Sequence, residues 1–292
     1  MTGNGIIRTI ALWTVLVLMT SCSIYDGYPN RRQYDVVLQL SDSAGNVIPD
    51  SIASVSEIYA FVNGVYQGRY AKESDGKIRV TFNDGDSVTF VAITGRRPGE
   101  YTLNTPQVGE SIENTWLQLK TAGSGVTHQP SAIYYGNIST AGEVNDVANV
   151  NRTITLRDIR AKVRVHVRGL LERFGPGNYR IVIEGLRSGV AYDGTTGGDY
   201  VNYEMGGAFN DKGDWITDPA IVLPSKGETV KLRIYKQDGT LLFDRDRDED
   251  GNPLVIKSND DAVFVVTASY MIDMTLRVIP FDEIINSGGL YQ

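Results

Sequence analysis

Apolar and polar residues alternate along much of this chain, and a period of two residues predicts β-strands. Over 159–168 the alternation is unbroken: the apolar set is Ile159, Ala161, Val163, Val165 and Val167, and the polar set is Arg160, Lys162, Arg164, His166 and Arg168. The same period runs through 77–82 and, less regularly, through several other short segments. Strands of this kind place one face in a core and the other in water.

Short turn signals separate the predicted strands. Asn63-Gly64 joins strands expected at 56–62 and 65–70, and it is a strong hairpin signal because both turn positions need a positive φ. Asp-Gly pairs precede the next predicted strands, so we expect residues 56–93 to form a meander of sequential strands. Helical periodicity is not sustained, and only 169–174 is expected to form a turn or two of helix.

The strand pattern weakens over 94–130 and again over 140–149, where the residues are polar and turn-rich. Many short strands with turn signals, arranged in two series, are typical of β-sandwiches. We therefore predict an all-β protein with two β-sandwich domains in tandem. The first domain is expected at 34–145 and the second at 146–292.

The beginning of the chain has the features of a secretory signal peptide. Arg8 is followed by the apolar run 10–19 and then by small residues up to Cys22, in the order of a basic region, an apolar region and a cleavage site. The run is much shorter than the roughly 20 residues that a membrane span needs. We therefore predict a signal peptide at 1–21.

Residues 18–22 (LMTSC) resemble the bacterial lipobox, in which the cysteine is lipidated and becomes the first residue of the mature protein. Cys22 is the only cysteine of the chain, so it is the predicted lipid attachment residue. Several acyl chains would give a durable attachment, since each buried methylene contributes about 0.8 kcal/mol. Ser23, and not Asp, follows Cys22, which by this resemblance implies the outer membrane. Residues 22–33 are predicted to form a lipidated, flexible tether.

Composition excludes several classes of function. The chain has 28 basic and 35 acidic side chains, a net charge of −7, which argues against neutralising nucleic-acid phosphates. With one Cys and two His, no disulfide can form within the chain, and little material is present for a zinc site or a His-dependent enzyme. We expect no cofactor, no metal and no nucleic-acid partner.

The candidates for an imidazole base are His128 and His166. His128 falls in a predicted loop, and His166 is expected to face solvent between Arg164 and Arg168, whose charges disfavour its protonated form. The sequence contains neither a Gly-x-Ser-x-Gly elbow beside them nor a Gly-rich phosphate loop leading into a helix. We therefore expect no enzyme, although a pair of carboxylates from distant positions, as in glycosidases, stays open.

The acidic run that begins at Asp244 is a candidate calcium loop. Asp246, Asp248 and Asp250, followed by Gly251, match the start of an EF-hand pattern. However, Lys257 stands where the pattern requires a bidentate Glu, and no helices flank the run. We interpret the segment as a solvated hairpin tip.

The basic stripe, which we define as Arg160, Lys162, Arg164, His166 and Arg168, could bind an anionic partner. It lacks the interleaved aromatic residues on which bases stack, and we interpret it as a solvated sheet face that discourages edge pairing. Of the 16 tyrosines, several fall on or beside predicted strands, where amphipathic rings commonly pack; they are Tyr34, Tyr59, Tyr66 and Tyr70. Trp116 and Trp215 follow the predicted signal peptide. A carbohydrate platform built from such rings stays open.

Three segments, together with the lipobox, resemble the FimB/Mfa-type fimbrial anchor lipoproteins of type V pili. The segments are 55–64 (VSEIYAFVNG), 157–165 (RDIRAKVRV) and 274–280 (MTLRVIP). Phe281 follows the proline of the last segment, where members of that family often have Trp. The resemblance covers most of the mature chain and implies two transthyretin-like β-sandwiches, a lipid anchor, and a role in fixing a fimbria to the outer membrane.

This resemblance leads to a hypothesis about function. We expect a non-enzymatic anchor or minor subunit of a fimbria, held at the cell surface by lipid on Cys22, whose C-terminal region contacts the first stalk subunit, a pilin. The tail 282–292 is free to take part, and the contact is expected to use strand pairing. Whether the chain donates or accepts a strand stays open. The alternative is a surface lipoprotein that binds glycans for nutrient capture.

Overall fold

The computed structural model describes residues 31–41, 46–48, 57–83, 85–94, 99–121, 125–140, 149–258, 260–269 and 273–286. The predicted signal peptide, Cys22 and tether residues 23–30 lie outside these ranges. Residues 31–33, predicted as part of the flexible tether, are instead the start of strand β1 (Arg31–Ser41), because they pair with residues 81–83. Strands dominate the described part, which also contains the short helices α2 (Leu170–Phe174) and α3 (Phe281–Asn286). The all-β prediction is confirmed, and α2 lies where a turn or two of helix was expected.

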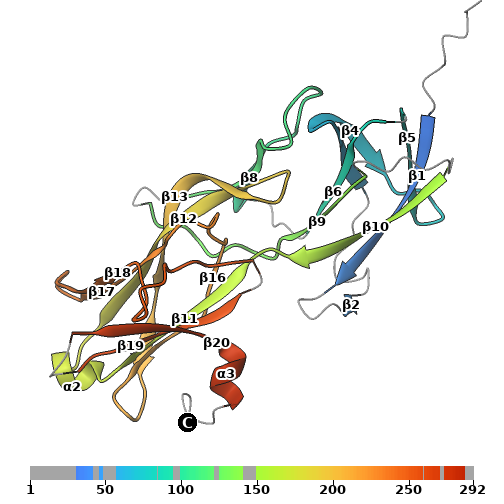
Figure 1. Ribbon diagram of the computed structural model, residues 1–292. Helices are drawn as coiled ribbons and strands as arrows, with labels where there is room; N and C mark the ends of the chain where they lie inside the picture. The colour runs from blue at the N-terminus through green and yellow to red at the C-terminus, as the bar shows by residue number, and fades with distance from the viewer. Residues whose placement is uncertain are drawn as a thin grey trace, which may run out of the picture.

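An eight-stranded sheet forms the N-terminal end of the molecule (Figure 1). Its strand order is β2-β1-β10-β9-β6-β3-β4, and β5 also pairs with β1. Its strands are β1 (Arg31–Ser41), β2 (Val47–Ile48), β3 (Glu57–Val62), β4 (Val65–Ala71), β5 (Lys77–Asn83), β6 (Val88–Thr94), β9 (Tyr134–Ser139) and β10 (Asn149–Asp158). Side chains from β1, β5 and β10 pack against side chains from β3 and β6 in one buried cluster. The sheet therefore folds over on itself as a sandwich.

Two six-stranded sheets form the other end and enclose a second, larger cluster. The first of these sheets has the strand order β14-β15-β11-β19-β20, and β16 also pairs with β11. It consists of β11 (Ala161–Arg168), β14 (Gly207–Phe209), β15 (Trp215–Thr217), β16 (Ala220–Val222), β19 (Asp261–Thr267) and β20 (Thr275–Pro280). The second sheet has the strand order β18-β17-β12-β8-β7, and β13 also pairs with β12. It consists of β7 (Tyr101–Leu103), β8 (Thr115–Leu119), β12 (Tyr179–Ala191), β13 (Thr196–Met205), β17 (Lys231–Lys236) and β18 (Leu241–Arg245).

The predicted hairpin between β3 and β4 is confirmed, but the predicted meander is wrong. Asn63 and Gly64 have φ values of 51° and 79° between the two strands, as the turn requires. β5, however, pairs with β1, and β6 pairs with β3 and β9. The reason is that β1 offers buried Tyr34 and Val36 to the same cluster as the apolar face of β5, and the alternation of a strand does not specify its neighbour.

Strand pairing crosses the boundary that the sequence predicts after residue 145. β7 and β8, which precede it, join the sheet of β12, because Trp116 and Leu117 are buried in the larger core. β10, which follows the boundary, returns to the first sheet, where it runs parallel to β1 and then meets β9. The sheets therefore do not divide the chain at that position.

Aromatic side chains connect the two ends of the molecule. Tyr192, directly after β12, has its ring centroid 5.5 Å from that of Tyr59, 5.4 Å from that of Phe61 and 6.3 Å from that of Trp116. The hydroxyl of Tyr192 donates to the backbone oxygen of Asn104 (2.8 Å). Residues of β3 and β6 that point away from the first cluster belong to the larger one. The molecule thus has a packed junction between its two ends.

Candidate functional site

The first candidate region is the start of β1, nine residues after Cys22. β1 pairs in parallel with β10 from Gln33↔Asn149 to Leu40↔Leu156, and antiparallel with β5 from Arg31↔Asn83 to Val37↔Lys77. Hydrogen bonding on both sides, together with the burial of its inward side chains, ties this strand into the sandwich. A force applied to the chain before β1 would act along a strand that is held on both sides.

Charged side chains on the other face of β1 add to this attachment. Nζ of Lys77 on β5 lies 2.9 Å from Oδ2 of Asp35, and Nε of Arg79 lies 3.6 Å from Oδ1 of Asp35. The hydrogen bond from Lys77 is the main cause that lowers the pKa of the Asp35 carboxyl. Asp35 is therefore ionised at neutral pH and supports the pairing of β1 with β5.

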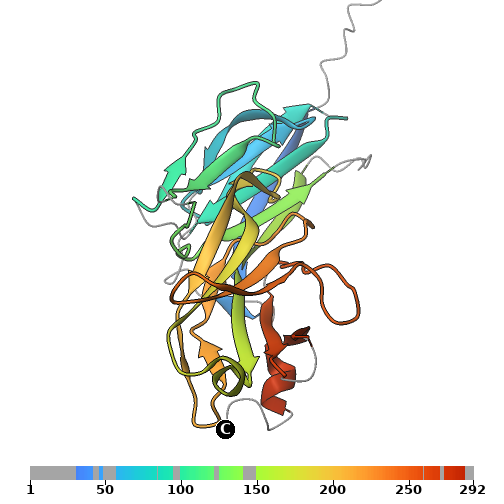
Figure 2. The ribbon, with the colours of Figure 1, turned by 90° about the vertical axis from the view of Figure 1, so that its left-hand side faces the viewer.

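The second candidate region is the edge strand β20, at the opposite end of the molecule from the start of β1 (Figures 1 and 2). β20 pairs antiparallel with β19 from Ala262↔Pro280 to Thr267↔Thr275. Helix α3 follows it directly and lies against both strands, so residues 282–286 of the tail are not free as predicted. A proline at the end of β20 fits an edge position, because proline has no amide hydrogen to donate to a neighbouring strand.

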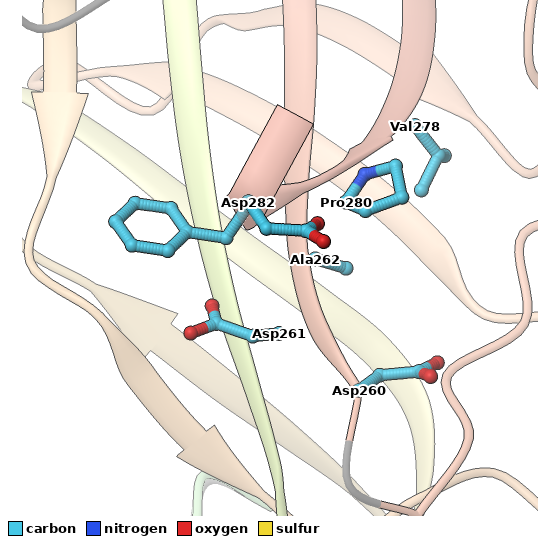
Figure 3. Close-up of a pocket in the computed structure, with 7 residues that line it drawn as sticks. Asp260, Asp261, Ala262, Val278, Pro280 and Asp282 are labelled. Atoms are coloured by element: carbon cyan, nitrogen blue, oxygen red, sulfur yellow. The ribbon is translucent and has the colours of Figure 1, made fainter. Parts of the chain in front are cut away.

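A hollow of about 530 Å³ opens beside the end of β20 (Figure 3). Its apolar lining consists of Ala262, Val278, Pro280 and Phe281, and its carboxylates are Asp260, Asp261 and Asp282. Val278 is 39% exposed although its cross-strand partner Phe264 is buried. The end of the sheet therefore combines apolar surface, acidic groups and an open strand edge.

The basic stripe differs from its predicted character. β11 lies inside its sheet, with β15 and β16 on one side and β19 on the other, so the stripe does not protect an edge. Lys162 and Arg164 both form ion pairs with Asp261, and Arg160 pairs with Asp158. The guanidinium of Arg164 also lies 3.7 Å from the ring centroid of Phe281. These partners leave little unpaired positive charge for an anionic ligand.

His166 is buried, not solvent-facing as predicted. Its side chain is 2% exposed, and Nε2 lies 3.0 Å from Oδ2 of Asp214, whose Oδ1 accepts the amide hydrogen of Gly169. Burial is the largest influence and lowers the pKa of His166, while the hydrogen bond with Asp214 opposes it. The alternating pattern predicts a solvent-exposed side chain at this position. His166 is buried instead because the loop before β15 places Asp214 over this part of the sheet. His128, in contrast, is exposed in the segment after Thr127.

We expect the stability of the protein to fall as the pH drops below 6.5, the ordinary pKa of this imidazole. Because the folded state disfavours the protonated form, the unfolded state binds a proton at a higher pH, and the free energy of unfolding falls through this range. Urea unfolding at pH 7.5, 6.5 and 5.5 would measure the slope. H166Q, whose amide can still contact Asp214, should have a flatter profile over the same range. An equal slope in both proteins would contradict the assignment.

The acidic run after β18 forms a closed turn. The carboxylate of Asp248 accepts the amide hydrogens of Asp250 (3.0 Å) and Asn252 (2.8 Å), and these contacts, with the side-chain bond from Asn252 first, lower its pKa. Gly251 has a φ of 84°. The predicted hairpin tip fits this geometry, but its end also contacts β20, since the amide of Glu249 donates to the carbonyl of Leu276 (2.7 Å). The structure thus uses Asp248 as a turn residue.

Comparison with known proteins identifies the family. The family model of the fimbrillin-A associated anchor proteins Mfa1 and Mfa2 matches residues 34–273. The chain belongs to this family. The resemblance found in the sequence is therefore confirmed, and the chain has a fimbrial or adhesin-like role of the kind that this family of cell-surface structural proteins performs.

Solved structures share the fold of this Mfa-family chain at low sequence identity. The fimbrial anchor protein Mfa2 from Porphyromonas gingivalis is 14% identical, with a TM-score of 0.61 over 86% of this chain and 98% of that one. A Bacteroides thetaiotaomicron protein described provisionally as polysaccharide-binding is 15% identical, with a TM-score of 0.57 over 87% and 99%. A Bacteroides ovatus protein described provisionally as an adhesin is 11% identical, with a TM-score of 0.56 over 89% and 96%. Curated protein sequences give no match.

Aromatic residues considered for a carbohydrate platform have packing roles instead. Tyr34, Tyr59, Tyr66, Trp116 and Trp215 are all buried in the two cores. Tyr200 is the aromatic residue with large exposure among the described residues, and its ring lies 3.9 Å from the guanidinium carbon of Arg187. The structure therefore gives these tyrosines and tryptophans the stabilising role that strand packing predicts.

Two features of the candidate site were absent from the sequence interpretation. Asp260 and Asp282 belong to the hollow, but single aspartates beside predicted strands carry no signal of their own. Pro280 at the end of a strand could have indicated an edge.

In the described residues, no helix has both the length and the apolar character of a membrane span. Cys22, the predicted lipid attachment residue, lies outside the described residues and stays a prediction.

Proposed function

We propose that this Mfa-family chain is the lipid-anchored anchor subunit of a fimbria, held in the outer membrane by acylated Cys22 and joined to a stalk subunit through strand pairing at its C-terminal end. The family match over 34–273 is the observation that carries the proposal. The lipobox at 18–22 supports the membrane attachment. No catalytic step belongs to this function.

The geometry of the two ends supports the proposal. Arg31, the first residue of β1, lies nine residue steps after Cys22. At roughly 3.3–3.6 Å per step they span at most about 32 Å. The body would therefore stand close to the membrane surface. The edge of β20 lies at the opposite end of the molecule from the start of β1 (Figure 1), where a stalk subunit would meet it away from the lipid.

The same arrangement suits a protein under tension. Tension from the tether reaches the body through β1, which pairs with β10 over Gln33–Leu40 and with β5 over Arg31–Val37. Force along the axis of β1 loads these pairs together instead of opening them one at a time. The packed junction at Tyr192 then passes the load to the C-terminal sheets.

We expect C22A to lose membrane attachment almost completely. Without the thiol no acyl chain can be added, so the predicted lipid attachment is lost. In cells that make the fimbria, incorporation of labelled palmitate, the membrane fraction of the protein and the amount of fimbriae shed into the medium would be measured. S23A keeps the cysteine and should behave as the parent protein. The proposal would be overturned if C22A stayed in the membrane fraction and its fimbriae were not shed into the medium.

A further inference from the structure

The outer edge of β20 has backbone groups available for a partner near Val278. The carbonyl of Leu276 accepts the amide of Glu249 (2.7 Å), so the groups of Leu276 point away from β19. In an antiparallel strand, residues two apart direct their N–H and C=O groups to the same side. The N–H and C=O of Val278 therefore also point outward, since the register with β19 has no shift.

The loop after β18 covers only the first part of this edge. Besides the bond to Leu276, Oε1 of Glu249 lies 3.0 Å from Nε of Arg277. Within the described ranges, no strand pairs with the outer edge of β20. Further along β20, Val278 and Pro280 line the hollow. An extended segment added here would meet hydrogen-bonding groups and an apolar recess together, as in β-strand addition.

The charge of the hollow points to a cationic partner. Asp261 is compensated by Lys162 and Arg164. Asp260 and Asp282 accept backbone amides from Lys257 and Glu283, but among the described residues neither forms an ion pair. Figure 3 shows their carboxylates pointing to the side on which Val278 lies, whereas the carboxylate of Asp261 points the other way. Two uncompensated negative charges therefore border the apolar lining.

We propose that the edge of β20 and this hollow dock an extended segment of another fimbrial subunit, in which a lysine or arginine enters the hollow. The alkyl stem of such a side chain packs on Val278 and Pro280, and its charged head meets Asp260 and Asp282, as long basic side chains do where apolar and acidic surfaces adjoin. This inference rests on the proposed function and specifies the chemistry of its partner.

Other occupants fit the charges less well. The tail 287–292 (SGGLYQ) follows α3 directly, but it contains no lysine or arginine. A second copy of this chain carries a net charge of −7, which opposes docking at an acidic hollow. A basic segment of a different subunit is the occupant that the charges favour.

The test uses the full-length chain in cells that make the fimbria, with the photoreactive residue p-benzoylphenylalanine in place of the exposed Glu283. The variant D260K/D282K reverses both charges of the hollow. The matched control E113K/D218K makes the same change in net charge at two exposed acidic residues elsewhere. The measured quantity is the covalent adduct with another fimbrial subunit, located by mass spectrometry of the adduct.

We expect the adduct in the parent and the control to reach a lysine- or arginine-containing segment, and D260K/D282K to reduce it by at least about tenfold, because like charges at an interface are strongly disfavoured. Replacing that partner residue by glutamate should restore the adduct in D260K/D282K. An unchanged adduct in D260K/D282K, an adduct to the chain's own tail, or an adduct between two copies would each overturn the docking proposal.

The anchor function is tested separately in the same cells. If the charge reversal has no effect while C22A still releases fimbriae, only the docking inference fails. If C22A stays attached, the proposed function fails, whatever the adduct shows. Equal thermal unfolding of D260K/D282K and the parent protein would show that both side chains act on docking and not on the fold.

Discussion

Replacing Tyr192 by alanine is expected to lower the free energy of unfolding by about 3–5 kcal/mol, the usual cost of truncating a large buried ring. The side chain is 2% exposed and contacts Tyr59, Phe61 and Trp116. Because these rings belong to strands from both ends of the molecule, the substitution removes the centre of the junction. We also expect the two ends to unfold in separate transitions, contrary to two-state behaviour.

Urea unfolding, followed by far-ultraviolet circular dichroism and by tryptophan fluorescence, would measure both effects on the mature chain. Trp116 lies within the junction, so its fluorescence should report the change there. The control is Y192F, which keeps the ring and loses only the hydroxyl bond to the carbonyl of Asn104, at about 1 kcal/mol. Equal losses in the two variants would show that the ring packing does not hold the ends together.

The second large effect is expected at β1, where V36D should unfold the N-terminal sandwich. Val36 is fully buried between the two halves of this sheet, and an unpaired buried carboxylate costs several kcal/mol, a large fraction of the 5–15 kcal/mol of a typical domain. The adjacent Val37 is 38% exposed and lies opposite Lys77. V37D therefore makes the same chemical change on the outer face and should cost less than about 1 kcal/mol.

Circular dichroism and limited proteolysis of the two variants would measure this difference. We expect V36D to be cleaved rapidly by the protease and V37D to stay folded and resist cleavage. A stable, protected V36D would contradict the pairing of β1 between β10 and β5.

The sequence was sufficient for features that depend on neighbouring residues. Alternation over 159–167 predicted a strand with a buried apolar face, and Asn63-Gly64 predicted a hairpin; the structure has both. The family resemblance could also be found in segments of the sequence and is confirmed. Such features are local, because side-chain direction alternates within a single strand and positive φ is a property of the turn residues themselves.

The tertiary structure decided which strands meet and therefore what each polar residue does. It placed β5 beside β1, carried β7 and β8 into the sheet of β12, and buried His166 under Asp214. It also brought Asp260 and Asp282 to one hollow at the edge of β20. No local pattern specifies these contacts, because pairing depends on which apolar faces can be buried together across distant parts of the chain.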